Sequence, residues 1–395
     1  MAAYHDRFAI FAMLGFRALG DFALAVMICS YLKRKIRNSA LLVYAQNDRP
    51  YKNDLVTLCP DINDRMFASG SAVPLEWLDI SGENPNSAPR GIVDRGFFHA
   101  SLVLSPRMIS TIAEDRAFKF VRCLRIPEAL EAELSAKFIA TGVSEDRWLV
   151  CTHAREDGYR YREVQSPRSV DPAPFSELAD YIIDDLGGQV VRLGSANMTP
   201  APARPNLIDL TGEEDFLLQA YALSRSRFAV VTDSGMLHVA NGLGVPFAAT
   251  NLEMMGAVLT GREGITAHHE QHLLMSRRVY HKDDLSGRPE KLGKIVRVTD
   301  SLAMAENTSV DFQAIANRMA VMTRYCQGWR ETYVEAAIEA ADSIAFPLPG
   351  ITPSLNYVRP PWWEESPDYV EVFKKETLGP VAYKLLKEGK LKPDF

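Results

Sequence analysis

Apolar residues along the chain alternate between short continuous runs and stretches at helical spacing, which is typical of a parallel α/β protein. Residues 8–14 (FAIFAML) form an apolar run of strand length, and cations at 33–35 favour the C-terminal end of the helix that follows. That helix is predicted from the spacing of Phe22, Ala25, Val26, Cys29 and Leu32. Further strands are predicted at 41–45, 99–104 and 118–124, and a loop-rich region at 47–95.

The same rhythm begins again at Trp148, after a predicted linking helix at 128–145. The expected strands are 148–152, 189–193, 207–210, 228–232 and 246–250, and the expected helices are 174–186, 213–224, 235–243, 311–326 and 329–345. Prolines and aromatics dominate 347–367, before a last amphipathic helix at 369–387. The pattern predicts two Rossmann-like domains and a tail, at residues 1–145, 146–345 and 346–395.

Composition narrows the class of partner. The chain has 395 residues and a net charge of -6, so it lacks the basic balance that nucleic-acid binding usually needs. Its five cysteines are odd in number and contain no CxxC pair, which favours reduced thiols over a disulfide framework or a zinc ribbon. They are Cys29, Cys59, Cys123, Cys151 and Cys326.

The N-terminal segment is apolar enough to need a check for a membrane anchor or signal. Between Phe8 and Tyr31, however, Arg17 and Asp21 interrupt the apolar run, and no basic cluster precedes it. We therefore expect a soluble, cytoplasmic protein. Peripheral membrane association and the oligomeric state stay open at this point.

The strongest chemical signal is the turn Thr232, Asp233, Ser234 and Gly235, which follows a predicted strand and opens a helix. Such a turn presents backbone N–H groups and the positive helix end at the carboxyl edge of the sheet, where a diphosphate is favoured. The alternative is that Asp233 or Ser234 simply caps the helix. His238, one turn further on, would by itself be a packing residue.

The span around this turn resembles family 9 glycosyltransferases, which include the ADP-heptose lipopolysaccharide heptosyltransferases. The shared pattern is D-L-T-G, then D-[ST]-G-x-x-H-x-A-x-x-L-G-x-P, here 209–212 and 233–246. The resemblance implies an α/β GT-B fold, with two Rossmann-like domains facing a cleft and a helical C-terminal appendage. It also implies that residues 232–235 and His238 bind the donor's diphosphate and sugar.

The first turn of the chain fits the same resemblance. Residues 14–21 (LGFRALGD) look like the family's L-G-A-L-G-D turn with two extra residues. The resemblance implies that Asp21 is the general base that accepts a proton from the acceptor hydroxyl. The alternative is that Asp21 caps the N-terminus of the following helix.

The middle of the chain departs from family 9. Its segment 150–159 looks more like a set of uncharacterised bacterial glycosyltransferase-like proteins, and the His153-x-Arg155 pair is similar to that of GDP-fucose-dependent fucosyltransferases. These resemblances imply donor contacts from His153, Arg155, Arg168 and Gly194, with an arginine fork on the phosphate. The alternative for Arg155 is an ion pair with Glu156 or Asp157. The E-N-T segment at 306–308 also matches that set, although a polar loop before a helix is the favoured explanation of three residues.

Other motifs are weaker. His268 and His272 are four residues apart, but without a third ligand a polar loop or acceptor segment is favoured over zinc. Pro360 to Trp363 would stack on a sugar or, more simply, pack the tail. There is no nicotinamide-type or P-loop glycine motif, so neither a metal nor a cofactor is expected.

Together these features predict a metal-independent glycosyltransferase in bacterial surface glycan or glycoconjugate synthesis. It would move a sugar from a nucleotide-sugar to a hydroxyl of a glycan, a lipid-linked acceptor or a small molecule. The alternatives are a nucleotide-sugar epimerase or hydrolase on the same fold, or a binding protein without catalysis.

Overall fold

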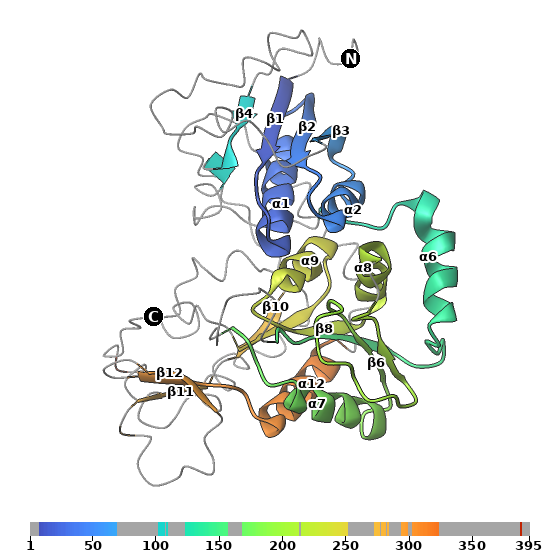
Figure 1. Ribbon diagram of the computed structural model, residues 1–395, viewed down its shortest axis with the longest axis vertical. Coiled ribbons are helices and arrows are strands. Elements are labelled where there is room, and N and C mark those ends of the chain that lie inside the picture. Colours follow the sequence, from blue (N-terminus) through green and yellow to red (C-terminus); the bar gives the residue numbers. More distant parts are fainter. Residues whose placement is uncertain are drawn as a thin grey trace.

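The computed structural model describes residues 8–68, 102–106, 108–109, 123–156, 168–212, 215–251, 272–276, 278–281, 283, 294–298, 302–323 and 388. Within these ranges the chain forms two parallel sheets flanked by helices, and a small antiparallel sheet (Figure 1). This arrangement agrees with the α/β, GT-B type of fold with two Rossmann-like units that the sequence predicts.

The first sheet has the strand order β3-β2-β1-β4, and all its pairings are parallel. Its elements are β1 (Phe8–Leu14), α1 (Leu19–Lys35), β2 (Ser39–Gln46), α2 (Pro50–Leu58), β3 (Ile62–Ala68) and β4 (Leu102–Leu104). The prediction of loop at 47–95 was wrong for α2 and β3. Helix α2 has only nine residues and starts on a proline, and its buried side chains include Lys52, so its apolar periodicity is weak.

The second sheet has the order β10-β9-β8-β5-β6-β7, which is the 3-2-1-4-5-6 order of a doubly wound Rossmann sheet read from β7. Its strands are β5 (Leu149–His153), β6 (Gln189–Arg192), β7 (Leu207–Asp209), β8 (Phe228–Thr232), β9 (Phe247–Thr250) and β10 (His272–Ser276). Its helices are α6 (Glu128–Ala140), α7 (Ala173–Asp184), α8 (Phe216–Arg225), α9 (Gly235–Leu243) and α12 (Ser309–Met322). Each of these elements except β10 was predicted, with small shifts at the ends.

Successive side chains along the strands of the second sheet point to opposite faces, so each strand contributes residues to two different hydrophobic clusters. Cys151, Val191 and Val231 belong to the cluster that contains α1, α8 and α9. Their neighbours Val150 and Val230 belong to a second cluster with α7 and α12, where the Phe175 and Phe312 rings lie 4.6 Å apart.

The helices of the two halves pack directly on one another. Figure 1 shows α1 and α2 below the first sheet, facing α9 and α8 above the second, and α1 contacts α9 while α2 contacts α8. A Cβ built on Gly235 would lie only 2.8 Å from both Gly20 N and Leu19 Cβ, so the starts of α1 and α9 touch through glycine. One apolar cluster therefore runs from β1 to β9 through both halves.

Several expectations need correction. The strand predicted at 118–124 is wrong for Cys123 and Leu124, because both backbone N–H groups donate to Gly242 O at the end of α9. The antiparallel sheet of β11 (Arg278–His281), β13 (Leu302–Ala305) and β12 (Ile295–Val298) was not predicted. His272 begins strand β10, so a helical face shared with His268 is excluded. His268, the two predicted helices at 329–345 and 369–387, residues 118–122 of the predicted strand, and the Pro360 to Trp363 segment lie outside the described residues.

Candidate functional site

The site lies where the strand order of the second sheet reverses, between β5 and β8. In open α/β sheets, ligands bind outside the carboxyl ends of the strands at this switch point. His153 ends β5, Ser234 follows β8, and His153 Nδ1 lies 3.1 Å from Ser234 Oγ. Two of the predicted donor residues, far apart in the sequence, are thus hydrogen-bonded across the switch point.

Hydrogen bonds hold three of the four residues of the turn from β8 into α9. Thr232 Oγ1 accepts the backbone N–H of Arg155 at 2.9 Å. The carbonyl oxygen of Asp233 accepts hydrogen bonds from Arg168 Nε at 3.2 Å and Nη2 at 3.1 Å. Together with the Ser234 contact to His153, these bonds bring seven of the predicted donor residues together at this turn once Gly235 is included.

Helix α9 begins without a side-chain cap. Its N-cap is Ser234, in the extended conformation, and the Ser234 side chain makes no capping hydrogen bond. Asp233 is therefore not the helix cap, since its carboxylate lies 3.3 Å from Arg168 Nη2 instead. The first-turn N–H groups that point out of a helix end, with the positive end of its dipole, suit an anionic ligand.

His153 is a neutral side chain at this site. Burial, together with the positive charges of Arg192 and Arg155, lowers the pKa of His153 to about 4. A neutral imidazole has one donor and one acceptor nitrogen. The ring can therefore hold the Ser234 hydroxyl at Nδ1 and keep Nε2 for a second partner, without adding charge to the turn.

Asp21 lies in the first turn of α1 and is exposed. The N-cap of α1 is Ala18, so the alternative that Asp21 caps this helix is wrong. Its neighbour Gly20 contacts the start of α9, and a Cβ on Gly20 would lie 3.0 Å from His238 Cδ2. The predicted base, the predicted His238 and the turn at 232–235 therefore come together where the two halves meet.

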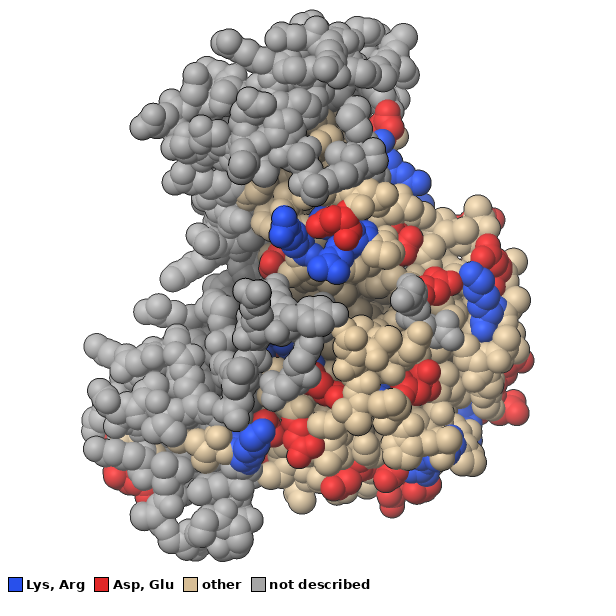
Figure 2. All heavy atoms as spheres, in the orientation of Figure 1, with Lys and Arg blue, Asp and Glu red and all other residues tan. Residues whose placement is uncertain are grey.

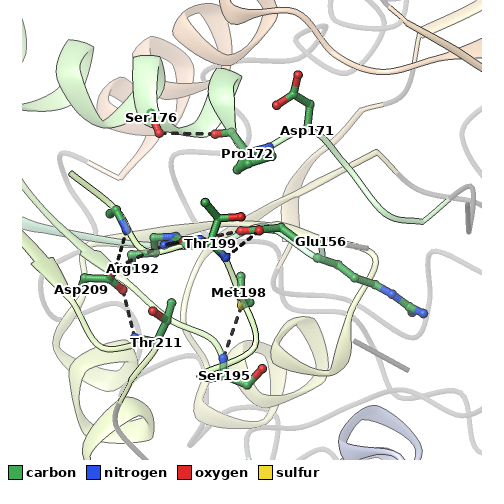
Figure 3. A network of polar contacts seen from close by, with 12 residues as sticks. Glu156, Asp171, Pro172, Ser176, Arg192, Ser195, Met198, Thr199, Asp209 and Thr211 are labelled. Carbon is green, nitrogen blue, oxygen red and sulfur yellow. Dashed lines mark hydrogen bonds and ion pairs between the residues drawn. The ribbon is translucent and has the colours of Figure 1, made fainter. Parts of the chain in front are cut away.

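An ion-pair network fixes the neighbouring edge of the sheet (Figure 3). Arg192 Nη2 lies 2.6 Å from Glu156 Oε1, and Arg192 Nη1 lies 3.2 Å from Asp209 Oδ2, with all three side chains largely buried. Glu156 Oε2 accepts the Thr199 N–H at 2.8 Å, and Arg192 also donates to Thr199 O. Glu156 thus pairs with Arg192, whereas Asp157, the other partner that the ion-pair alternative gave Arg155, lies outside the described residues.

The same network secures the loop that follows β6. Burial by itself would raise the pKa of Asp209. The N–H groups of Ala201 and Thr211 and the charge of Arg192 outweigh that effect, so the pKa lies below its ordinary value. At the start of the loop, Gly194 N donates to Gln219 Oε1 at 3.0 Å, and Gln219 Nε2 donates back to Gly194 O at 2.8 Å. Predicted residue Gly194 therefore has a fixed backbone beside the switch point.

Sequence reasoning missed the part that Glu156, Asp209 and Gln219 play in the site. Asp209 begins the D-L-T-G segment at 209–212 and Glu156 follows the predicted strand 148–152, but neither position shows which side chain the acid meets. Which acid meets which arginine depends on strand order, and no single segment of sequence contains that information.

The described residues carry no group of three or more His, Cys, Asp or Glu side chains placed to hold a metal ion. In the same ranges, no helix is long and apolar enough to cross a membrane. On the face shown in Figure 2, acidic and basic side chains are interspersed over the described surface of both halves.

Comparison with known proteins gives likenesses in structure alone. No protein-family model and no curated protein matches the chain. The chain is similar to a solved family 9 glycosyltransferase from Veillonella parvula, at 16% identity over 61% of this chain and 80% of that chain, with a TM-score of 0.43. It is similar to ADP-heptose lps heptosyltransferase II of E. coli at 16% identity over 61% and 84%, with a TM-score of 0.42. It is also similar to UDP-GlcNAc 2-epimerase from Neisseria meningitidis bound to UDP-GlcNAc, at 10% identity over 66% and 90%, with a TM-score of 0.32.

Proposed function

We propose that this chain is a glycosyltransferase that moves a sugar from a nucleotide-sugar donor to an acceptor hydroxyl. The observation that supports this most is the contact between the starts of α1 and α9 at Gly20 and Gly235. Asp21 directly follows Gly20 in the sequence, and Gly20 contacts the start of α9, which suits a diphosphate. A proton acceptor and an anion site, one from each half, are what transfer between two bound substrates requires.

In the proposed reaction, the acceptor hydroxyl oxygen bonds to the anomeric carbon of the donor sugar while Asp21 accepts the hydroxyl proton. The bond between the anomeric carbon and the diphosphate oxygen breaks, and the nucleoside diphosphate leaves with that electron pair. The N–H groups at the start of α9 stabilise the charge that develops on the diphosphate. Arg155, at the carboxyl end of β5, is the proposed cation on the phosphates.

The remaining donor contacts follow from the same placement. Ser234 and Gly235 of the turn, with His153 hydrogen-bonded to Ser234, are the proposed phosphate contacts. His238 faces the first half, on the side from which the acceptor would approach. Gly194 and the loop after β6 lie on the opposite side of the switch point, where the nucleoside would extend. The helix start and the arginine, and no divalent cation, neutralise the leaving group in this proposal, and the motif resemblance favours bacterial surface glycan or glycoconjugate synthesis.

A thermal-shift screen of ADP-, GDP-, UDP-, CMP- and TDP-sugars tests the donor half of the proposal. A donor at 100 times its Kd adds about 2.7 kcal/mol to the free energy of unfolding. Transfer to an added acceptor, unaffected by EDTA, would complete the test. An altered free sugar formed without acceptor would instead indicate an epimerase or hydrolase, and binding without turnover a binding protein. The proposal fails if no nucleotide-sugar stabilises the chain.

A further inference from the structure

Asp233 presents an electrostatic difficulty for a diphosphate site. Its carboxylate belongs to the residue directly before the N-cap of α9, and its side chain is one-quarter exposed. A negative charge at the start of a helix repels an incoming anion, at the point where the helix dipole attracts it. Something must offset this carboxylate if the turn is to bind phosphate.

Arg168 is placed to do so. Its guanidinium donates two hydrogen bonds to the Asp233 carbonyl oxygen, and its Nη2 lies 3.3 Å from Asp233 Oδ1. The segment that carries Arg168 is itself anchored, because Val170 N donates to Arg155 O at 2.8 Å at the end of β5. A planar fork that spans a carbonyl and a carboxylate of one residue fixes both the conformation and the charge of that residue.

We propose that Arg168 is a positioning residue, which prepares the turn for a diphosphate by holding the Asp233 carbonyl and neutralising the Asp233 carboxylate, and which acts on the ligand through Asp233. This rests on the proposed function, since it assumes that a nucleoside diphosphate binds the turn. It differs from the sequence-based expectation, in which Arg168 contacts the donor directly.

The two roles make opposite forecasts for a double substitution. Arg168→Met removes the charge and keeps the stem, and Asp233→Asn removes the carboxylate and keeps its size. If Arg168 acts through Asp233, nucleotide affinity falls in Arg168→Met, rises in Asp233→Asn because a repelling charge is removed, and recovers in the double variant. A direct phosphate contact would be lost whether or not Asp233 is charged.

The Kd values of ADP, GDP and UDP for the full chain, measured by calorimetry in the four variants of this cycle, test the proposal. We expect the effect of Arg168→Met to shrink by at least about fivefold in the Asp233→Asn background. Arg204→Met is the matched control, because Arg204 also pairs with acids of the same half, Asp180 and Asp184, and should leave the Kd unchanged. Equal loss in both backgrounds, or no loss in Arg168→Met, overturns the proposal.

Amide hydrogen exchange of residues 232–237, measured without nucleotide, separates this proposal from the proposed function. We expect faster exchange in Arg168→Met than in the wild type and Arg204→Met, because the carbonyl clamp is gone. Unchanged exchange overturns the clamp. If the wild type binds none of the three nucleotides and no nucleotide-sugar of the thermal-shift screen stabilises it, the proposed function and the charge role both fail, and the exchange result reports on the clamp alone.

Discussion

The carboxyl edges of the two parallel sheets meet at Gly20 and Gly235, but they are built differently. At the first edge, α1 begins on Ala18 without a described side-chain cap, and it carries an exposed acid, Asp21. At the second edge, the start of α9 is held by a neutral histidine and an arginine clamp. The first half therefore offers a carboxylate that can accept a proton. The second half offers a helix N-terminus, where Arg168 offsets the charge of Asp233.

Replacing Asp21 tests the first edge, and we expect the largest effect there. Asp21→Asn should slow glycosyl transfer by about 10²–10⁴-fold, because an amide cannot accept the hydroxyl proton. Since Asp21 lies in the first turn and is not the cap, stability should fall by only about 0.3–1 kcal/mol. Transfer rate, donor Kd and melting temperature are measured on one preparation, with Asp64→Asn on β3 as the exposed control in the same half. Full activity in Asp21→Asn would show that Asp21 is not the general base.

Replacing Arg192 tests how far the second edge depends on ion pairs. Arg192→Met leaves Glu156 and Asp209 without their shared cation in a largely buried place, so we expect a loss of about 3–5 kcal/mol in the free energy of unfolding. Arg204→Met is a matched control, because Arg204 also pairs with two acids, but those are more than half exposed. There the loss should be about 0–1 kcal/mol in urea unfolding. Similar losses in both variants would contradict the contrast between buried and exposed networks.

The pH dependence of stability tests the neutral histidine. Because the pKa of His153 falls to about 4 in the folded chain, the unfolded chain binds the extra proton as pH drops below about 6.5. Stability contributed by the neutral ring is therefore present above pH 6.5 and lost between pH 6.5 and 4, by roughly 3 kcal/mol in total. His153→Asn, whose amide can replace Nδ1, should flatten this part of the curve. A curve that keeps the wild-type slope in that variant would assign the pH dependence to other groups.

Adding a methyl group at the meeting point gives the smallest expected effect. In Gly235→Ala, the new Cβ would lie 2.8 Å from the backbone nitrogen of Gly20, so the halves must shift apart, at a cost of about 1–3 kcal/mol. Gly212→Ala, where a Cβ would meet nothing within 4 Å, is the matched control. Urea unfolding and nucleotide affinity are measured together. If Gly235→Ala behaves like Gly212→Ala in both, the contact between the helix starts is not tight in solution.

The sequence predicted the parts of the fold that local patterns determine. Strand β8 and helix α9 were predicted to the residue, because an apolar run, a turn and a helical period follow one another without interruption. Helix α2 and the antiparallel strands were missed, since they are short and depend on tertiary packing for stability. Among candidate site residues, the conformation of the turn at 232–235, between β8 and α9, was predictable from its local context. The clamp on Asp233 and the pairing of Glu156 with Arg192 were not, because strand order brings those residues together.

The apolar cluster that runs through α1 and α9 has a consequence for heat denaturation. Neither half buries its own facing surface, since Met27 of α1 and the buried Leu124 of the first half both pack against Gly242 of α9. The calorimetric and van't Hoff enthalpies of the two halves should then agree for one joint transition. A fragment that ends after residue 145 would expose the packed face of α1 to water, and we expect it to self-associate through that face.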